Sequence, residues 1–333
     1  MFAERLWATG MQVDAVVKSD RLLEAERHFG ENNVNNGSLK DILSKSPDII
    51  VVSTPNPVEE VLQQVRDNLS SRTTVVLPQN GIAVVEVAKD ILKDSNVSLV
   101  RASLFTPVSN VNGNVDYDAQ KLRIGLSAVP GFRQNPNLDQ DFLKTGDLFR
   151  ESGFDVRLFG DYRSMEWTKL VLNGVGSTSA ITGFTPLETF TDPELYVVET
   201  KALKQRLRLL KEEGIPLADI PWSGAPLLPL FDHLPMVIKK SGMVKGLYTG
   251  RIVKGRGNKP SASARKITEG KPTELEFYHQ PFIDLGVKHQ LPSSVDSAIM
   301  QIVKSQAKGE IDISTLSPVE RKMLLIDALN KNE

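Results

Sequence analysis

The chain has 333 residues, of which 40% are hydrophobic and 24% charged, and its 40 basic and 41 acidic residues leave a net charge of −1. This composition is that of an ordinary folded protein, and it excludes the strong overall basic charge with which many proteins attract nucleic acid. The absence of cysteine excludes disulfides, thiolate nucleophiles and cysteine-ligated zinc. The four histidines are too scattered for metal-ligand spacing, so no metal site is predicted.

The first half of the chain alternates between strand and helix patterns. Buried strands are predicted at residues 48–53 and 73–77, where β-branched apolar residues follow one another. A helix is predicted between them, another helix at 84–92 and a strand at 98–105. Such alternation favours parallel pairing with right-handed crossovers. We therefore predict an α/β fold with a Rossmann-like, doubly wound parallel sheet.

Two closing strands are predicted at residues 122–127 and 154–159, after which strand patterns stop. One long helix is expected over 163–181, and a third begins near Val295. Between these two, a helix is expected with Asp192 as its N-cap and Gly214 just past its end. The sequence thus predicts a Rossmann-type domain over 1–160 and an all-helical domain over 161–330.

The opening segment does not have the pattern of a complete nucleotide-binding domain. Residues 2–10 are typical of the end of a first helix and 12–17 of a second strand, so we expect no first strand or glycine-rich turn in the chain. Gly255-Arg-Gly257 lies far downstream, without a strand before it. Two explanations are open: a true start upstream of Met1, or a loss of cofactor binding.

Three blocks carry a family resemblance: Val75-Val-Leu-Pro-Gln-Asn-Gly81, Trp167-Thr-Lys-Leu-Val-Leu-Asn173 and Gly270-Lys-Pro-Thr-Glu-Leu-Glu276. In this order they resemble the ketopantoate reductase (2-dehydropantoate 2-reductase) family, over roughly residues 2–305. The resemblance implies that residues 1–160 form an NADP-binding domain and that residues 161–330 form a helical substrate and catalytic domain like that of 6-phosphogluconate dehydrogenase. It also implies NADPH-dependent reduction of 2-dehydropantoate to pantoate in pantothenate and coenzyme A biosynthesis, or reduction of a related branched 2-keto acid.

Departures from the family pattern leave the substrate open. Ser177 stands where a second asparagine is usual, Lys266 stands where an aspartate is usual, and His279-Gln280 replaces the usual Asn-Gly. The lysine usual after the second buried strand is replaced around residues 54–56. The missing glycine-rich turn and the replaced asparagine and lysine suggest an alternative, a non-catalytic member of the same fold that acts as a binding or regulatory protein.

The predicted substrate site lies on the helix that carries the second block. Lys169 and Asn173 are four residues apart and share a helix face, with Ser177 expected one turn further along. The Lys169 ammonium could give a proton to a ketone oxygen, while Asn173 and Ser177 orient the substrate. Ser261 is a further predicted substrate contact. Solvated surface positions are the structural alternative for such side chains.

The predicted cofactor contacts are Lys18, Asn80 and Glu274. Asn80 follows the carboxyl end of a strand, where open α/β sheets bind ligands, and the resemblance implies contact with both cofactor and substrate. Lys18 directly follows a predicted strand and favours NADP, because a basic group suits a 2′-phosphate. The resemblance implies that Glu274 orients Lys169 or binds a ribose hydroxyl. A simple turn and a strand-end charge are the alternatives for Asn80 and Lys18.

Basic residues recur over residues 239–266, with no acidic residue between Asp232 and Glu269. This segment could bind a polyanion such as RNA, but Tyr248 is its only aromatic residue and we favour a solvated loop. We expect a small 2-keto acid as the partner, no membrane contact, and a monomer or homodimer. A cytoplasmic location is expected, or a mitochondrial one if a targeting segment precedes Met1.

Overall fold

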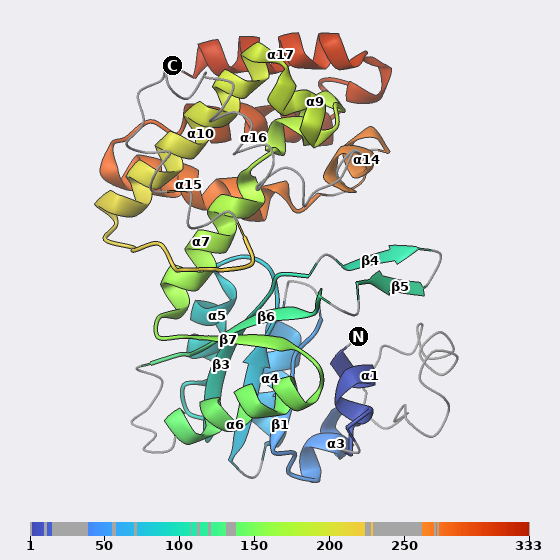
Figure 1. The fold of residues 1–333 in the computed structure, drawn as a ribbon, viewed down its shortest axis with the longest axis vertical. Helices are drawn as coiled ribbons and strands as arrows, with labels where there is room; N and C mark the ends of the chain where they lie inside the picture. The colour runs from blue at the N-terminus through green and yellow to red at the C-terminus, as the bar shows by residue number, and fades with distance from the viewer. Residues whose placement is uncertain are drawn as a thin grey trace. The chain divides into compact units, whose positions relative to one another are not determined.

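The structure is a computed structural model that describes residues 2–9, 12–14, 39–54, 58–69, 72–106, 108–111, 114–118, 121–130, 138–223, 228, 262–269, 271 and 273–332. The chain divides into two compact units, Met1–Met165 and Glu166–Glu333. The sequence places the corresponding boundary near residue 160. Figure 1 shows the elements of both units.

The first unit is built on a five-stranded sheet, with the strands in the order β1-β2-β3-β6-β7. Their bounds are β1 (Ile49–Val51), β2 (Thr73–Leu77), β3 (Val97–Leu104), β6 (Arg123–Ala128) and β7 (Asp155–Phe159). The predicted strands are therefore present: β2 has the predicted bounds, and the ends of the other four differ from the prediction by at most two residues. The described residues before β1 contain helices and no strand, and the predicted strand at 12–17 lies mainly outside the described residues.

The sheet is mixed rather than wholly parallel, which corrects the prediction at one pairing. β1, β2 and β3 run parallel, β6 runs antiparallel to β3, and β7 runs parallel to β6. A parallel neighbour needs a crossover connection, usually helical. Between β3 and β6 the described chain instead forms a hairpin, β4 (Val108–Val111) and β5 (Asn114–Tyr117), so β6 returns in the opposite direction.

Helices cover both faces of this sheet (Figure 1). Val75 and Leu77 of β2 share a core with α4 (Glu59–Asn68) and α5 (Val84–Leu92). Val76 points to the other face, because side chains alternate along a strand, and packs in the core that contains Phe149 of α6 (Leu138–Glu151). Burial on both faces explains why β2 is apolar without interruption. The short helices α1 (Phe2–Trp7) and α3 (Leu39–Ser44) complete the described unit.

The described part of the second unit is helical and contains no strand. Its helices are α7 (Tyr162–Gly174), which begins just before the division, α8 (Ser177–Thr182), α9 (Pro186–Thr191), α10 (Pro193–Glu212), α14 (Ala262–Thr268), α15 (Leu275–His289), α16 (Ser294–Ala307) and α17 (Pro318–Lys331), with a 3₁₀ turn at Ile313–Thr315. α8 lies at the centre: all six of its residues are buried, and it packs against α10, α14, α16 and α17. This mixed sheet followed by a helical unit confirms the predicted fold class.

The single helix predicted over 163–181 is wrong, because the structure breaks it into α7 and α8. Val175 and Gly176 separate the two helices, and Gly176 has a φ of 79°. This left-handed conformation is open to glycine and costly for other residues. Ser177 is therefore the first residue of a new helix and does not continue the face that carries Lys169 and Asn173.

Both ends of α10 lie where the sequence pattern predicts them. The carboxylate of Asp192 accepts hydrogen bonds from the backbone N–H groups of Glu194 and Leu195. Pro193 occupies the first turn, where its missing N–H costs nothing. Gly214 follows the end of the helix with a φ of 71°, as expected for a C-terminal glycine.

Candidate functional site

The loops after β1 and β2 are joined by Gln79. Because β1 and β2 run parallel, both loops leave the same edge of the sheet. Gln79 is buried, and its side-chain amide donates hydrogen bonds to the backbone carbonyls of Val52 and Thr54. The glutamine of the Gln-Asn-Gly motif is thus a structural link between the two loops.

Arg101 of β3 holds the same motif from inside the unit. Its guanidinium is fully buried and donates to the backbone carbonyls of Leu77, Gln79, Gly81 and Ala102. Gly81 has a φ of 97°, a conformation that favours glycine. Asn80 is the exposed member of the motif. The structure therefore leaves the predicted cofactor contact at the surface of the sheet's carboxyl edge.

Two buried oxygen atoms at this edge have no hydrogen-bond partner among the described residues. They are Oε1 of Gln79 and Oγ1 of Thr54. Buried polar atoms are normally paired, and unpaired ones call for a partner such as a water or a ligand. Both oxygens can accept a hydrogen bond from a hydroxyl or amide group. The edge therefore fits a ligand rich in such groups, including a nicotinamide dinucleotide.

Lys169 and Asn173 lie on one face of α7, one turn apart, and both are half-buried. The same helix is fixed in the second unit by Trp167, whose ring packs edge-on against Phe282 of α15 with centroids 5.5 Å apart. Both aromatic side chains are buried. The arrangement brings an ammonium and an amide together on a helix that is anchored by its other face.

Ser177 is placed differently from the prediction. Its side chain is buried, and its hydroxyl donates to the backbone carbonyl of Gly174 at 2.8 Å. The bond joins the last turn of α7 to the start of α8. The hydroxyl oxygen keeps the capacity to accept a hydrogen bond.

Glu274 is exposed and occupies the N-cap position of α15. Its carboxylate accepts a hydrogen bond of 2.7 Å from the Tyr278 hydroxyl, one turn along the helix. Lys18 and Ser261 lie outside the described residues. Of the basic segment, only its end at residues 262–266 is described, within α14.

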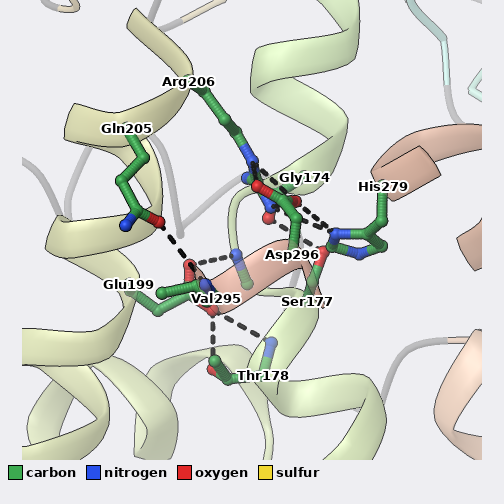
Figure 2. Close-up of polar contacts among 10 residues, drawn as sticks. Gly174, Ser177, Thr178, Glu199, Gln205, Arg206, His279, Val295 and Asp296 are labelled. Carbon is green, nitrogen blue, oxygen red and sulfur yellow. Dashed lines mark hydrogen bonds and ion pairs between the residues drawn. The ribbon is translucent and has the colours of Figure 1, made fainter. Parts of the chain in front are cut away.

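A buried charged cluster was not predicted from the sequence (Figure 2). Arg206 of α10 pairs with Asp296 of α16 at 2.7 Å, and His279 of α15 lies with Nδ1 2.6 Å from the same carboxylate oxygen. Because a carboxylate only accepts, His279 Nδ1 carries the proton. Burial lowers the pKa of His279. Burial alone would raise the pKa of Asp296, but Arg206 and His279 outweigh it and lower that pKa.

A second buried charge, Glu199 of α10, supports the break between α7 and α8. Its carboxylate accepts from the backbone N–H groups of Gly176 (2.9 Å) and Thr178 (3.0 Å) and from the Thr178 hydroxyl (2.6 Å). Figure 2 shows Glu199 beside Thr178. Arg206, two turns along α10, lies so close to Gly174 that a Cβ there would be 2.3 Å from Nη1. The only sequence signal for this cluster is the departure at His279-Gln280, since its other members are far apart along the chain.

The described ranges contain neither a cluster of metal-binding side chains nor a helix that could span a membrane. No group of three or more histidine, aspartate or glutamate side chains there could hold a metal ion. None of the helices in that part of the chain is both long and apolar enough to span a bilayer.

Comparisons with known proteins converge on one family. The family described as "Ketopantoate reductase PanE/ApbA" matches residues 1–122, and "Ketopantoate reductase PanE/ApbA C terminal" matches residues 161–307. A 2-dehydropantoate 2-reductase from Aquifex aeolicus is 21% identical over 265 residues, which cover 78% of this chain and 76% of the relative.

Solved structures show the same fold at low identity. A PanE/ApbA family ketopantoate reductase from Ralstonia eutropha superposes with a TM-score of 0.70 at 14% identity, covering 93% of this chain and 95% of its own. D-mandelate dehydrogenase, solved with NADH and anilino(oxo)acetate, gives 0.67 at 14% identity, with 92% and 94% covered. Since the two family matches together span most of the chain, it belongs to the ketopantoate reductase PanE/ApbA family.

Proposed function

We propose that the protein reduces a branched 2-keto acid, 2-dehydropantoate or a close relative, with NADPH as the reductant. The observation that carries the proposal is the pairing of Lys169 and Asn173 on one face of α7, within the part of the chain that matches the family's C-terminal region. An alcohol product requires a hydride at the carbonyl carbon and a proton at its oxygen. A nicotinamide cofactor supplies the hydride when bound.

Lys169 is the proposed proton donor. Its ammonium hydrogen-bonds the ketone oxygen and transfers a proton to it as negative charge develops there. General acid catalysis of this kind contributes about 10²–10⁴-fold to the rate. The half-buried position of Lys169 keeps part of its stem in the protein while leaving the side chain accessible.

Asn173 is the proposed substrate-orienting residue, because its amide offers two donors and an acceptor to a carboxylate or hydroxyl. Ser177 contributes its hydroxyl oxygen as an acceptor, since its hydroxyl proton is donated to the backbone carbonyl of Gly174. Ser261 is a further proposed substrate contact. Glu274 keeps its proposed role toward a ribose hydroxyl, with Tyr278 as its neighbour.

Asn80 is the proposed cofactor contact in the first unit. The unpartnered oxygens of Gln79 and Thr54 support this, because the hydroxyl and amide groups of a dinucleotide can donate to them. Lys18 is proposed to favour NADPH over NADH by pairing with the 2′-phosphate. This preference would weaken as ionic strength rises.

Replacing Lys169 by methionine tests the proposal. The change removes the ammonium and keeps an unbranched chain, so we expect kcat with a 2-keto acid to fall by about 10²–10⁴-fold while cofactor affinity stays within about twofold. Lys204→Met, at an exposed position of α10, is the matched control and should retain full activity. Activity of Lys169→Met equal to that of the wild type would refute Lys169 as the acid.

Titration of the wild-type protein with NADPH distinguishes a reductase from the non-catalytic alternative. A reductase should quench or shift the fluorescence of NADPH with a micromolar dissociation constant. Absence of NADPH binding would favour the binding or regulatory role.

A further inference from the structure

We propose that Arg101 is a positioning residue of the cofactor site, which holds Asn80 in place by binding the backbone carbonyls of the residues on both sides of it. The inference rests on the proposed function insofar as Asn80 binds a nicotinamide cofactor. Its structural part concerns the first unit alone and stands on the contacts of a single buried side chain.

The register of the sheet brings Arg101 to the motif. Arg101 on β3 pairs with Leu77, the last residue of β2, so the loop that follows β2 starts beside it. Nη1 donates to the Leu77 carbonyl. Nη2 donates to the carbonyls of Gln79 at 2.5 Å and Gly81 at 3.2 Å. One nitrogen therefore binds the carbonyls of the two residues that flank Asn80 in the chain.

These bonds set the orientation of the loop. A trans peptide group is planar, with its N–H directed opposite to its carbonyl. The carbonyls of Gln79 and Gly81 turn inward to Arg101, so the N–H groups of Asn80 and Ile82 turn the other way. The Asn80 side chain, exposed between them, is presented on the outer side of the loop.

An arginine suits this role better than any other side chain. Its planar guanidinium carries five donors in a fixed arrangement, which serve several carbonyls at once. A lysine ammonium keeps the charge but is a compact group on a flexible stem, and it cannot reproduce that fork. The loss of donors would leave buried carbonyls without partners, so the loop would rearrange toward solvent.

The test compares Arg101→Lys with Arg72→Lys by fluorescence titration with NADPH. Arg72 precedes β2 at the opposite end of that strand and pairs with Asp141, so the same substitution there leaves the loop untouched. We expect the cofactor dissociation constant of Arg101→Lys to rise about tenfold or more, with the KM for the keto acid at saturating cofactor within about twofold. Arg72→Lys should match the wild type in both.

Two further measurements separate positioning from general damage. In an Asn80→Ala background, Arg101→Lys should add little further loss of cofactor affinity, because the two changes remove the same interaction. Additive losses would overturn the proposal, as would equal losses for cofactor and keto acid. Should Arg101→Lys fail to fold, Arg101→Gln, which is neutral and keeps two donors, takes its place in the same comparisons.

Amide hydrogen exchange of the cofactor-free protein tests, without any ligand, whether Arg101 holds the loop after β2. The loop at residues 78–83 should exchange faster in Arg101→Lys than in the wild type or Arg72→Lys. Unchanged exchange would overturn the positioning role. A wild-type protein that binds no nicotinamide would instead defeat the proposed function, while the exchange result would still decide whether Arg101 holds the loop.

Discussion

Gly174 shows how closely buried groups constrain the end of α7. It ends α7, one residue after Asn173, and the guanidinium of Arg206 occupies the space that a side chain would need. Arg206 cannot withdraw freely, because it pairs with the buried Asp296. The glycine is therefore required by packing rather than by its backbone angles.

Gly174→Ala should lower the free energy of unfolding by about 1–3 kcal/mol, as overpacking in a core does. Gly160→Ala is the matched control, because a Cβ at Gly160 would meet nothing within 4 Å. Urea denaturation of both variants measures the difference. Equal stabilities of the two variants would contradict the account of Arg206 and Gly174.

The residues on α7 and those around the loop after β2 differ in how well their positions can be predicted from the sequence. The spacing of Lys169 and Asn173 is enough to put them on one helix face, and the turn after β2 is enough to expose Asn80. Arg101 is not predictable in this way. It interrupts an apolar strand, and its role depends on the neighbouring strand's register, which the sequence does not specify.

At the scale of elements, the Arg206–Asp296–His279 cluster joins α10, α16 and α15 inside the second unit (Figure 2). The cluster makes the stability of these helices depend on pH. The pKa of His279 is lower in the folded protein than its ordinary value of about 6.5. Between those two pKa values the unfolded chain binds more protons than the folded one, so stability rises with pH in this window and is lost on acidification.

We expect the free energy of unfolding to fall as the pH drops below about 6.5, by at most about 1.4 kcal/mol per pH unit for this one group. His279→Asn removes the titration but keeps an N–H donor for Asp296. Its unfolding free energy should therefore change less over this range. The prediction would be contradicted if the free energy of unfolding of His279→Asn fell with pH as steeply as that of the wild type.

Element bounds follow the sequence closely where one physical signal dominates. The strand at 73–77 and the helix at 84–92 are predicted exactly, because uninterrupted apolar burial and helical periodicity admit no competing reading. The break at Val175–Gly176 is missed because apolar and small residues continue through it, and the buried Glu199 that stabilises it comes from another helix. The strand β6 is predicted, but its antiparallel direction is missed, because it follows from the hairpin between β3 and β6 that replaces a crossover helix.

At the scale of the whole molecule, the chain combines a mixed-sheet unit with a helical unit and belongs to the ketopantoate reductase PanE/ApbA family. The overall class was predictable because the switch from alternating strands and helices to helices alone is visible along the sequence. Lys18 and Ser261 stay predictions, since they lie outside the described residues.

Transfer of deuterium from reduced nicotinamide labelled at its transferable position tests the central claim most directly. The wild-type protein would be mixed with labelled NADPH and a branched 2-keto acid, and the product analysed by mass spectrometry. The account predicts a 2-hydroxy acid with one deuterium on its second carbon, at a rate that Lys169→Met greatly reduces. A keto acid recovered unreduced, with the labelled nicotinamide unspent, would contradict it.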